Sequence, residues 1–206
     1  MRVAAFPRPL LLRANQVLRR MVYSSTLLTR VAFGVRLTRT TPPVSFWELG
    51  SLAMMHALRT QLRDDMRMVD VGTGPYAIMA LWAMRRWRLD VVATEIEPAW
   101  CAWAERMAAA NERSLEVVCC DLLEGISGPF DAACFVPPFI PEESFSRSPA
   151  LLRISDPHQR ELLWRRSCGG PLGWETVDRF YAMVGPLLRP GASAFVSINH
   201  YHVSPE

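Results

Sequence analysis

Residues 69–76, VDVGTGPY, place an acidic residue and two glycines where a strand-like run gives way to a helix-like run. Gly72 and Gly74 allow the chain to turn sharply and leave backbone amides exposed at the start of the next helix, an arrangement that binds small ligands. The dinucleotide fingerprint G-x-G-x-x-G is not completed, because Ala77 stands where its third glycine would be. The turn therefore favours a ligand other than a pyrophosphate, although a tight turn of this kind can also be purely structural.

Three acidic residues each lie at the end of an expected strand. Asp70 precedes the turn, where its carboxylate would repel a diphosphate but attract an ammonium group such as that of S-adenosylmethionine. Glu95, in VVATEIEP, ends the next expected strand and can accept hydrogen bonds from both ribose hydroxyls. Asp121, in VVCCDLLEG, ends the third and can accept a hydrogen bond from an adenine amino group. Asp121 alone would most often be a cap at the start of a loop, but three acids that each end a successive strand predict a nucleoside site in one crevice.

The elements that must position these residues alternate regularly after a helix that carries Leu52, Met55, Leu58 and Leu62 on one side. Alternation of apolar strands with helices predicts an α/β, Rossmann-like fold with a mostly parallel, doubly wound sheet. The proline-punctuated stretch 137–173 is expected to be functional or partly helical. Strands are expected at about 67–71, 90–94, 115–119, 131–136 and 192–198, and helices at about 77–87, 98–111 and 174–188, with the turn RPG before the last strand.

Composition limits the class of protein. The chain has 206 residues, 50% of them hydrophobic, which is enough for one well-buried domain. Its longest strongly apolar run, residues 77–84, is far shorter than the roughly 18 residues of a membrane helix, so no membrane partner is expected. The five cysteines form no CxxC pair and have no neighbouring histidine, so we expect no metal, reduced thiols and a cytoplasmic location.

The N-terminal region is basic, with eight arginines and no acid before Glu48. It could be a mitochondrial presequence, an arm for an anionic partner or, as we favour, the solvated face of a helix. No interleaved aromatic pattern indicates nucleic acid binding. A helix is expected over about 10–29 and a strand or hairpin over 31–39, before a boundary within 41–50 where Ser45 can cap the next helix. The expected division is an extension, 1–45, and a catalytic domain, 46–206.

Residues 66–141 resemble the class I S-adenosylmethionine-dependent methyltransferases, in particular the protein-(glutamine-N5) methyltransferases that modify peptide release factors. MVDVGTGPYAIMALW is similar to the first motif of that family, ATEIEP to its ribose-binding motif, and FDAACFVPPFIP to its FDxxxxNPPYIP signature. CGGPLGWETVDRFY, residues 168–181, resembles its GGxDGLxxY run. The resemblance implies methyl transfer with S-adenosyl-L-methionine as cofactor, bound by Asp70, Gly72, Gly74, Tyr76, Glu95, Ile96, Asp121 and Leu122.

The sequence departs from the family signature at the residue that would meet the methyl acceptor. Val136 stands in place of the asparagine whose side chain accepts a hydrogen bond from the target amide or amine, and Pro137, Pro138 and Phe139 follow. Valine cannot accept that bond, so we expect a small-molecule amine, phenolate, thiolate or carboxylate as acceptor, with N- and O-methylation left open. Phe139 can stack on a planar substrate, although VPPF can also be only a rigid turn. If a base is needed, His200 is the first candidate.

The sequence leaves several alternatives open. The family normally adds an antiparallel hairpin after SINHYHV, whereas this chain ends at Glu206. The hairpin could be missing, or a homodimer partner or the strand expected at 31–39 could cover the exposed edge of the sheet. The chain could instead transfer another group from the sulfonium, cyclise it, or serve as a non-catalytic scaffold for a partner methyltransferase.

Overall fold

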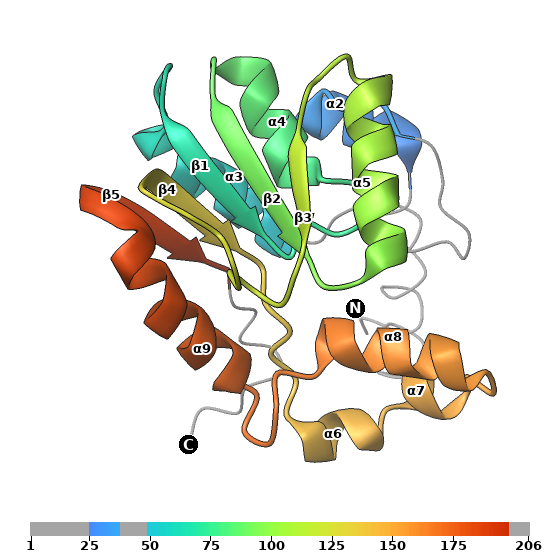
Figure 1. Cartoon of the computed structure of the whole chain (residues 1–206). Coiled ribbons are helices and arrows are strands. Elements are labelled where there is room, and N and C mark those ends of the chain that lie inside the picture. Colours follow the sequence, from blue (N-terminus) through green and yellow to red (C-terminus); the bar gives the residue numbers. More distant parts are fainter. Residues whose placement is uncertain (1–24, 38–48, 198–206) are drawn as a thin grey trace, which may run out of the picture.

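The chain forms a five-stranded sheet in which every strand runs parallel to its neighbours (Figure 1). The computed structural model describes residues 25–37 and 49–197. The strand order is β3-β2-β1-β4-β5, so the chain leaves β1 in one direction and returns to build the other half of the sheet. This confirms the predicted doubly wound, Rossmann-like sheet. The strands are β1 (Arg67–Val71), β2 (Asp90–Glu95), β3 (Glu116–Cys119), β4 (Phe130–Phe135) and β5 (Leu188–Val196).

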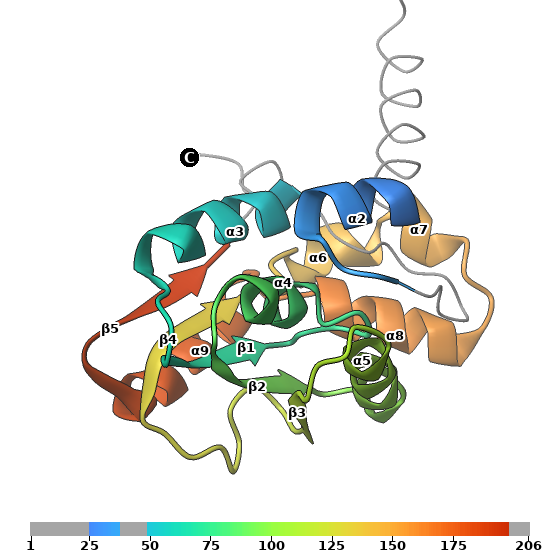
Figure 2. The ribbon, with the colours of Figure 1, turned by 90° about the horizontal axis from the view of Figure 1, so that it is seen from above.

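Helices cover both faces of the sheet, because successive strand residues point to opposite sides. Met68 packs in a core with the helices on one face, whereas Val69 and Val71 pack with residues of the last helix on the other. Figure 2 shows helices on both faces of the sheet. In the described part of the chain, no helix is long and apolar enough to cross a membrane. The first face carries α2 (Thr26–Phe33), α3 (Leu49–Gln61), α4 (Ile78–Arg86) and α5 (Pro98–Ala110), and the second carries α9 (Glu175–Val184).

The strand or hairpin predicted over 31–39 is wrong. Residues 31–33 form the end of α2, and residues 34–37 form no strand. The backbone of Arg36 is held at the end of α5, where it exchanges two hydrogen bonds of 2.8 Å with the side chain of Asn111. This segment therefore cannot cover the β5 edge of the sheet. Residues 10–24 of the predicted helix, residues 38–39 and the predicted cap Ser45 lie outside the described residues.

The segment between β4 and α9 is partly helical, as predicted for 137–173. Its helices are α6 (Glu142–Ser146), α7 (Pro149–Leu152) and α8 (Pro157–Ser167), which lie beyond the carboxyl ends of the strands (Figures 1 and 2). The helix predicted over 174–188 ends at Val184 and continues as a 3₁₀ turn, Gly185–Leu187. The predicted RPG turn is wrong, because residues 189–191 lie within β5. They stand at a shift of register, between the residues of β5 that pair with Phe130 and Ala132 of β4.

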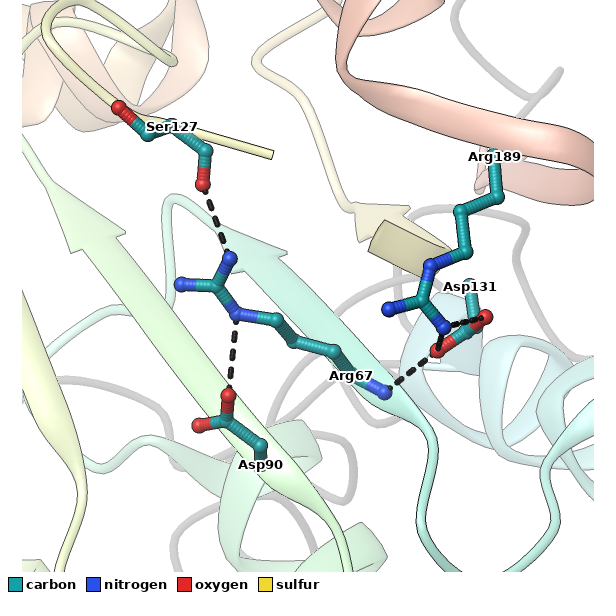
Figure 3. Close-up of polar contacts among 5 residues, drawn as sticks. All are labelled: Arg67, Asp90, Ser127, Asp131 and Arg189. Carbon is teal, nitrogen blue, oxygen red and sulfur yellow. Dashed lines mark hydrogen bonds and ion pairs between the residues drawn. The ribbon is translucent and has the colours of Figure 1, made fainter. Parts of the chain in front are cut away.

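Polar side chains tie the strand beginnings together at the edge of the sheet opposite the predicted site (Figure 3). Asp131 accepts hydrogen bonds from the backbone amide of Arg67, at 2.7 Å, and from Nη1 of Arg189, at 2.8 Å. The Arg67 guanidinium donates to the Ser127 carbonyl through Nη1. Its Nε lies 3.0 Å from Asp90 Oδ2, as an ion pair in which the N–H is not directed at the oxygen. Asp131 therefore links β1, β4 and β5.

Replacing Asp131 by alanine is expected to lower the free energy of unfolding by about 2 kcal/mol, because a backbone amide and an arginine lose their shared acceptor. Chemical denaturation measures the change. Glu116→Ala is a matched control, since it removes an exposed carboxylate from the start of β3. An Asp131 variant as stable as this control would contradict the role assigned to the network.

Candidate functional site

The sheet brings the predicted site residues together at its carboxyl edge. Register places Glu95 opposite Cys119, and the Cys120 amide donates to the Glu95 carbonyl at 3.0 Å, so Asp121 follows directly beside β2. On the other side of β1, Val71 is paired with Phe135, which puts the start of VPPF next to the glycine turn. Four consecutive strand ends therefore carry the three acids, the turn and VPPF, as the sequence predicted.

Glu95 connects β2 to the glycine turn. Its side chain is buried, and its two oxygens accept from the amides of Gly74, at 2.9 Å, and Glu97, at 3.1 Å. Burial raises the pKa of Glu95, while the backbone amides that donate to it act in the opposite direction. Gly74 has a φ of +66°, and a Cβ built there would meet no atom within 4 Å. The turn thus leaves open space directly beside a buried carboxylate.

Asp70 lies beneath the turn, where the chain itself supplies its partners. Its Oδ2 accepts from Thr73 Oγ1 at 2.6 Å and from the Ala80 amide at 3.1 Å, and its Oδ1 accepts from Cys134 Sγ at 3.3 Å. Burial raises the pKa of Asp70, and the bonds from Thr73, Cys134 and Ala80 oppose that shift. The carboxylate therefore fixes the turn to α4 and β4. Asp70 is also predicted to attract an ammonium group through its negative charge, and this attraction stays a prediction.

Asp121 differs from the other two acids because it is partly exposed and ion-paired. Its Oδ2 lies 2.7 Å from Nη2 of Arg179 in α9. Leu122, the next residue, is buried and adopts a φ of +51°. Ile96, after β2, exposes 41% of its surface, whereas Tyr76 in the turn is buried. The carboxyl edge therefore offers both a carboxylate and an apolar surface beside β2 and β3.

The VPPF segment packs against residues 168–181, the run that resembles the GGxDGLxxY motif. The Gly169 amide donates to the Ile140 carbonyl, and the Ile140 amide donates to the Ser167 carbonyl, both at 3.0 Å. Gly173 has a φ of +87°, and a Cβ there would lie 2.6 Å from the Phe139 carbonyl oxygen. A side chain at this position would therefore push VPPF away, so glycine is required for the two segments to pack this closely after β4.

Val136 lies between the start of α3 and the end of β5. Ser197 donates through its amide to the Phe135 carbonyl at 3.0 Å and through its hydroxyl to the Gly50 carbonyl at 3.1 Å. A Cβ built on Gly50 would lie 3.9 Å from Val136 Cγ1. Pro137 is buried, while Pro138 and Phe139 are half-buried. The predicted base His200 lies outside the described residues.

Sequence reasoning missed the partners of the acids. Thr73, Cys134 and Arg179 each bond to a predicted site residue, but Cys134 and Arg179 are 64 and 58 residues from their partners. Only Thr73, three residues from Asp70 within the turn, carried a local signal. Within residues 25–37 and 49–197, no group of three or more His, Cys, Asp or Glu side chains could hold a metal ion.

Comparisons with known proteins show a likeness to methyltransferases in sequence and in fold. No family model matches the chain. A release factor glutamine methyltransferase of Koribacter versatilis is 28% identical over 139 residues, which cover 66% of this chain and 48% of that protein. The chain thus spans about half the length of this curated relative.

Two solved structures show the same architecture. A methyltransferase from Pyrococcus furiosus has a TM-score of 0.60 at 19% identity, over 88% of this chain and 76% of that one. A 16S rRNA methyltransferase of Thermus thermophilus, in complex with AdoMet and guanosine, has a TM-score of 0.53 at 20% identity, over 73% of this chain and 34% of that one. The chain therefore has the Rossmann-like fold of the class I S-adenosylmethionine-dependent methyltransferases.

Proposed function

We propose that this protein is an S-adenosylmethionine-dependent methyltransferase that binds its cofactor at the carboxyl ends of β1, β2 and β3. The observation that carries the proposal is the buried Glu95 carboxylate, which is joined to the Gly74 amide at 2.9 Å beside open space over the turn. A carboxylate at the end of the second strand suits the two hydroxyls of a ribose. The likeness to methyltransferases in sequence and fold supports the same cofactor.

Each group at the edge has a distinct part in this proposal. Glu95 accepts hydrogen bonds from the ribose, and Asp121 accepts one from the adenine amino group. The adenine ring packs against apolar side chains that flank these acids. The glycine turn, which Asp70 holds in place, contacts the methionine end of the cofactor. The flanking apolar residues are Ile96 and Leu122, and the turn residues are Gly72, Gly74 and Tyr76.

The bound cofactor supplies an electrophilic methyl carbon on a sulfonium, and the protein must hold the acceptor in line with it. Such alignment requires reacting atoms about 3 to 3.5 Å apart and a site that excludes water. Val136, Pro137, Pro138 and Phe139 follow β4 next to the turn, so they are placed to form the acceptor side of the site. The close packing of this segment on residues 168–181 supports that role.

The acceptor in this proposal is a small molecule with an amine, phenolate, thiolate or carboxylate, methylated on nitrogen or oxygen. Val136 offers no oxygen to receive the N–H of a planar amide, which disfavours protein glutamine and adenine amino groups. Phe139 would stack on a planar acceptor. His200 is the proposed base where one is needed, since histidine titrates near neutral pH.

Transfer of a labelled methyl group tests the function. The purified protein is incubated with S-adenosylmethionine labelled in its methyl group and with small-molecule, RNA and protein fractions of a cell extract. We expect label in the small-molecule fraction and S-adenosylhomocysteine as the product. Label in RNA or protein would overturn the proposed acceptor, and methylthioadenosine as product would indicate transfer of another group. Failure to bind S-adenosylhomocysteine at millimolar concentration would overturn the cofactor itself.

Cofactor affinity is expected to fall as the pH is lowered, and the fall should begin above 4.5, the ordinary pKa of a glutamic acid. Burial raises the pKa of Glu95, so the carboxylate that accepts the ribose hydroxyls takes up a proton at a higher pH than an exposed glutamate does. Below that pKa, affinity should fall up to about tenfold per pH unit. Calorimetry with S-adenosylhomocysteine from about pH 8 to about pH 5 measures it. An affinity that does not change even when the titration is extended to about pH 4.5 would contradict the assignment.

A further inference from the structure

The packing of α9 fixes an arginine beside the proposed adenine site. Phe180 is fully buried, with its ring centroid 5.0 Å from that of Phe135, and it shares a core with Leu122 and Val184. This core attaches α9 to the connection that follows β3. Arg179 immediately precedes Phe180, so the packing of α9 brings its guanidinium to the edge where Asp121 lies.

The ion pair of Arg179 with Asp121 involves only one of the two carboxylate oxygens. Nη2 of Arg179 lies 2.7 Å from Asp121 Oδ2 and 3.9 Å from an oxygen of Glu124. A guanidinium can bind both oxygens of a carboxylate, but here only Nη2 of Arg179 donates, and only to Oδ2. Among the residues that the structure describes, Oδ1 of Asp121 has no donor. One acceptor oxygen is thus left at the carboxyl edge, where the exposed Ile96 follows the neighbouring strand β2.

We propose that Arg179 is a positioning residue that makes the site selective for adenine, an inference that rests on the proposed function. By holding Oδ2, Arg179 directs Oδ1 of Asp121 towards the exocyclic amino group of the base. In a base that carries an oxygen in place of this amino group, that oxygen would face Asp121 Oδ1. Both are acceptors, so neither would receive a hydrogen bond. Without Arg179, the partly exposed Asp121 side chain turns and is hydrated, and this discrimination weakens.

Calorimetric titration with S-adenosylhomocysteine and with its 6-oxo analogue, S-inosylhomocysteine, tests the inference. The unmodified protein should prefer the adenosine compound by about tenfold or more, the effect of one hydrogen bond to a charged group. In Arg179→Gln the preference should fall towards unity, because affinity for S-adenosylhomocysteine drops while that for the inosine compound changes little. Arg189→Gln is the matched control, since it removes an arginine that pairs with an aspartate at the opposite edge of the sheet.

A double-mutant cycle separates positioning from a general effect of charge. Once Asp121 is replaced by alanine, adding Arg179→Gln should not alter the remaining preference between the two compounds. An Arg179→Gln variant that keeps the full preference, or that loses affinity equally for both compounds, would overturn the inference. These outcomes leave the proposed function standing, whereas a protein that binds neither compound would overturn the function instead.

Discussion

Replacing Glu95 by glutamine is expected to lower the affinity for S-adenosylhomocysteine about 100-fold, or about 2.7 kcal/mol. The two oxygens of Glu95 accept from the amides of Gly74 and Glu97. Glutamine has one oxygen and one amino group, so whichever way its amide is turned, an amino group faces a backbone N–H. The variant therefore loses the charge that binds the ribose and also disturbs the turn. Isothermal titration calorimetry measures the affinity.

The control for this experiment is Glu116→Gln, which makes the same chemical change at an exposed position at the start of β3, away from the carboxyl edge. It should bind as the unmodified protein does. Circular dichroism and thermal unfolding establish that both variants fold. A folded Glu95→Gln protein with unchanged affinity would show that Glu95 serves only the turn and that the ribose lies elsewhere.

The features that the sequence predicted well are those with local signals. Glycines in the turn, acids at strand ends and apolar β-branched runs each constrain their own neighbourhood, and parallel pairing then brings the strand ends to one edge. This is why the sequence predicts Glu95 at the end of the second strand, in one crevice with Asp70 and Asp121, whereas its bond to the Gly74 amide is seen only in the structure. The strand β1 was placed at 67–71, the range that the structure shows.

The features that were missed depend on tertiary packing. VAF in residues 31–33 is β-branched and aromatic, yet it ends α2, because Ser25 caps the helix and Phe33 is buried in the core. Residues 189–191 carry the sequence signal of a turn, but in the fold they lie within β5, at the register shift between its pairs with Phe130 and Ala132 of β4. Arg179 carried no local signal, since its contact with Asp121 depends on the burial of Phe180 next to it. Propensity is a weak guide wherever packing decides.

Asp70 is the site residue whose structural and binding roles are hardest to separate, because three donors converge on its buried carboxylate. Asp70→Ala leaves Thr73, Ala80 and Cys134 without their acceptor. It is expected to lower the free energy of unfolding by about 3 to 5 kcal/mol. It should also abolish cofactor binding, because the turn loses the carboxylate that holds it. Chemical denaturation measures the first effect. Because this variant alone cannot distinguish a lost turn from a lost charge, Asp70→Asn is its necessary companion.

Asp70→Asn is expected to keep the fold and to lose only the charge. Its carbonyl oxygen can accept from Thr73 and Ala80, and its amino group faces the weakly accepting sulfur of Cys134. Burial raises the pKa of Asp70 above its unfolded value, so ionisation costs the folded state stability as pH rises through the folded pKa. Asparagine has no such cost. At about pH 7 the variant should therefore be at least as stable as the unmodified protein, and this advantage should shrink as pH falls towards 3.8.

Two ligands then decide whether the charge of Asp70 acts on the ammonium group of the cofactor. S-adenosylhomocysteine carries that group and methylthioadenosine does not, while both carry the same adenosine. If the charge attracts the ammonium group, Asp70→Asn lowers affinity for S-adenosylhomocysteine by about tenfold, or about 1.4 kcal/mol, and leaves that for methylthioadenosine unchanged. Unchanged affinity for both would mean that Asp70 acts only through its bonds to the turn. An equal fall for both would mean that asparagine distorts the turn, because a change in the turn alters the site that the two ligands share.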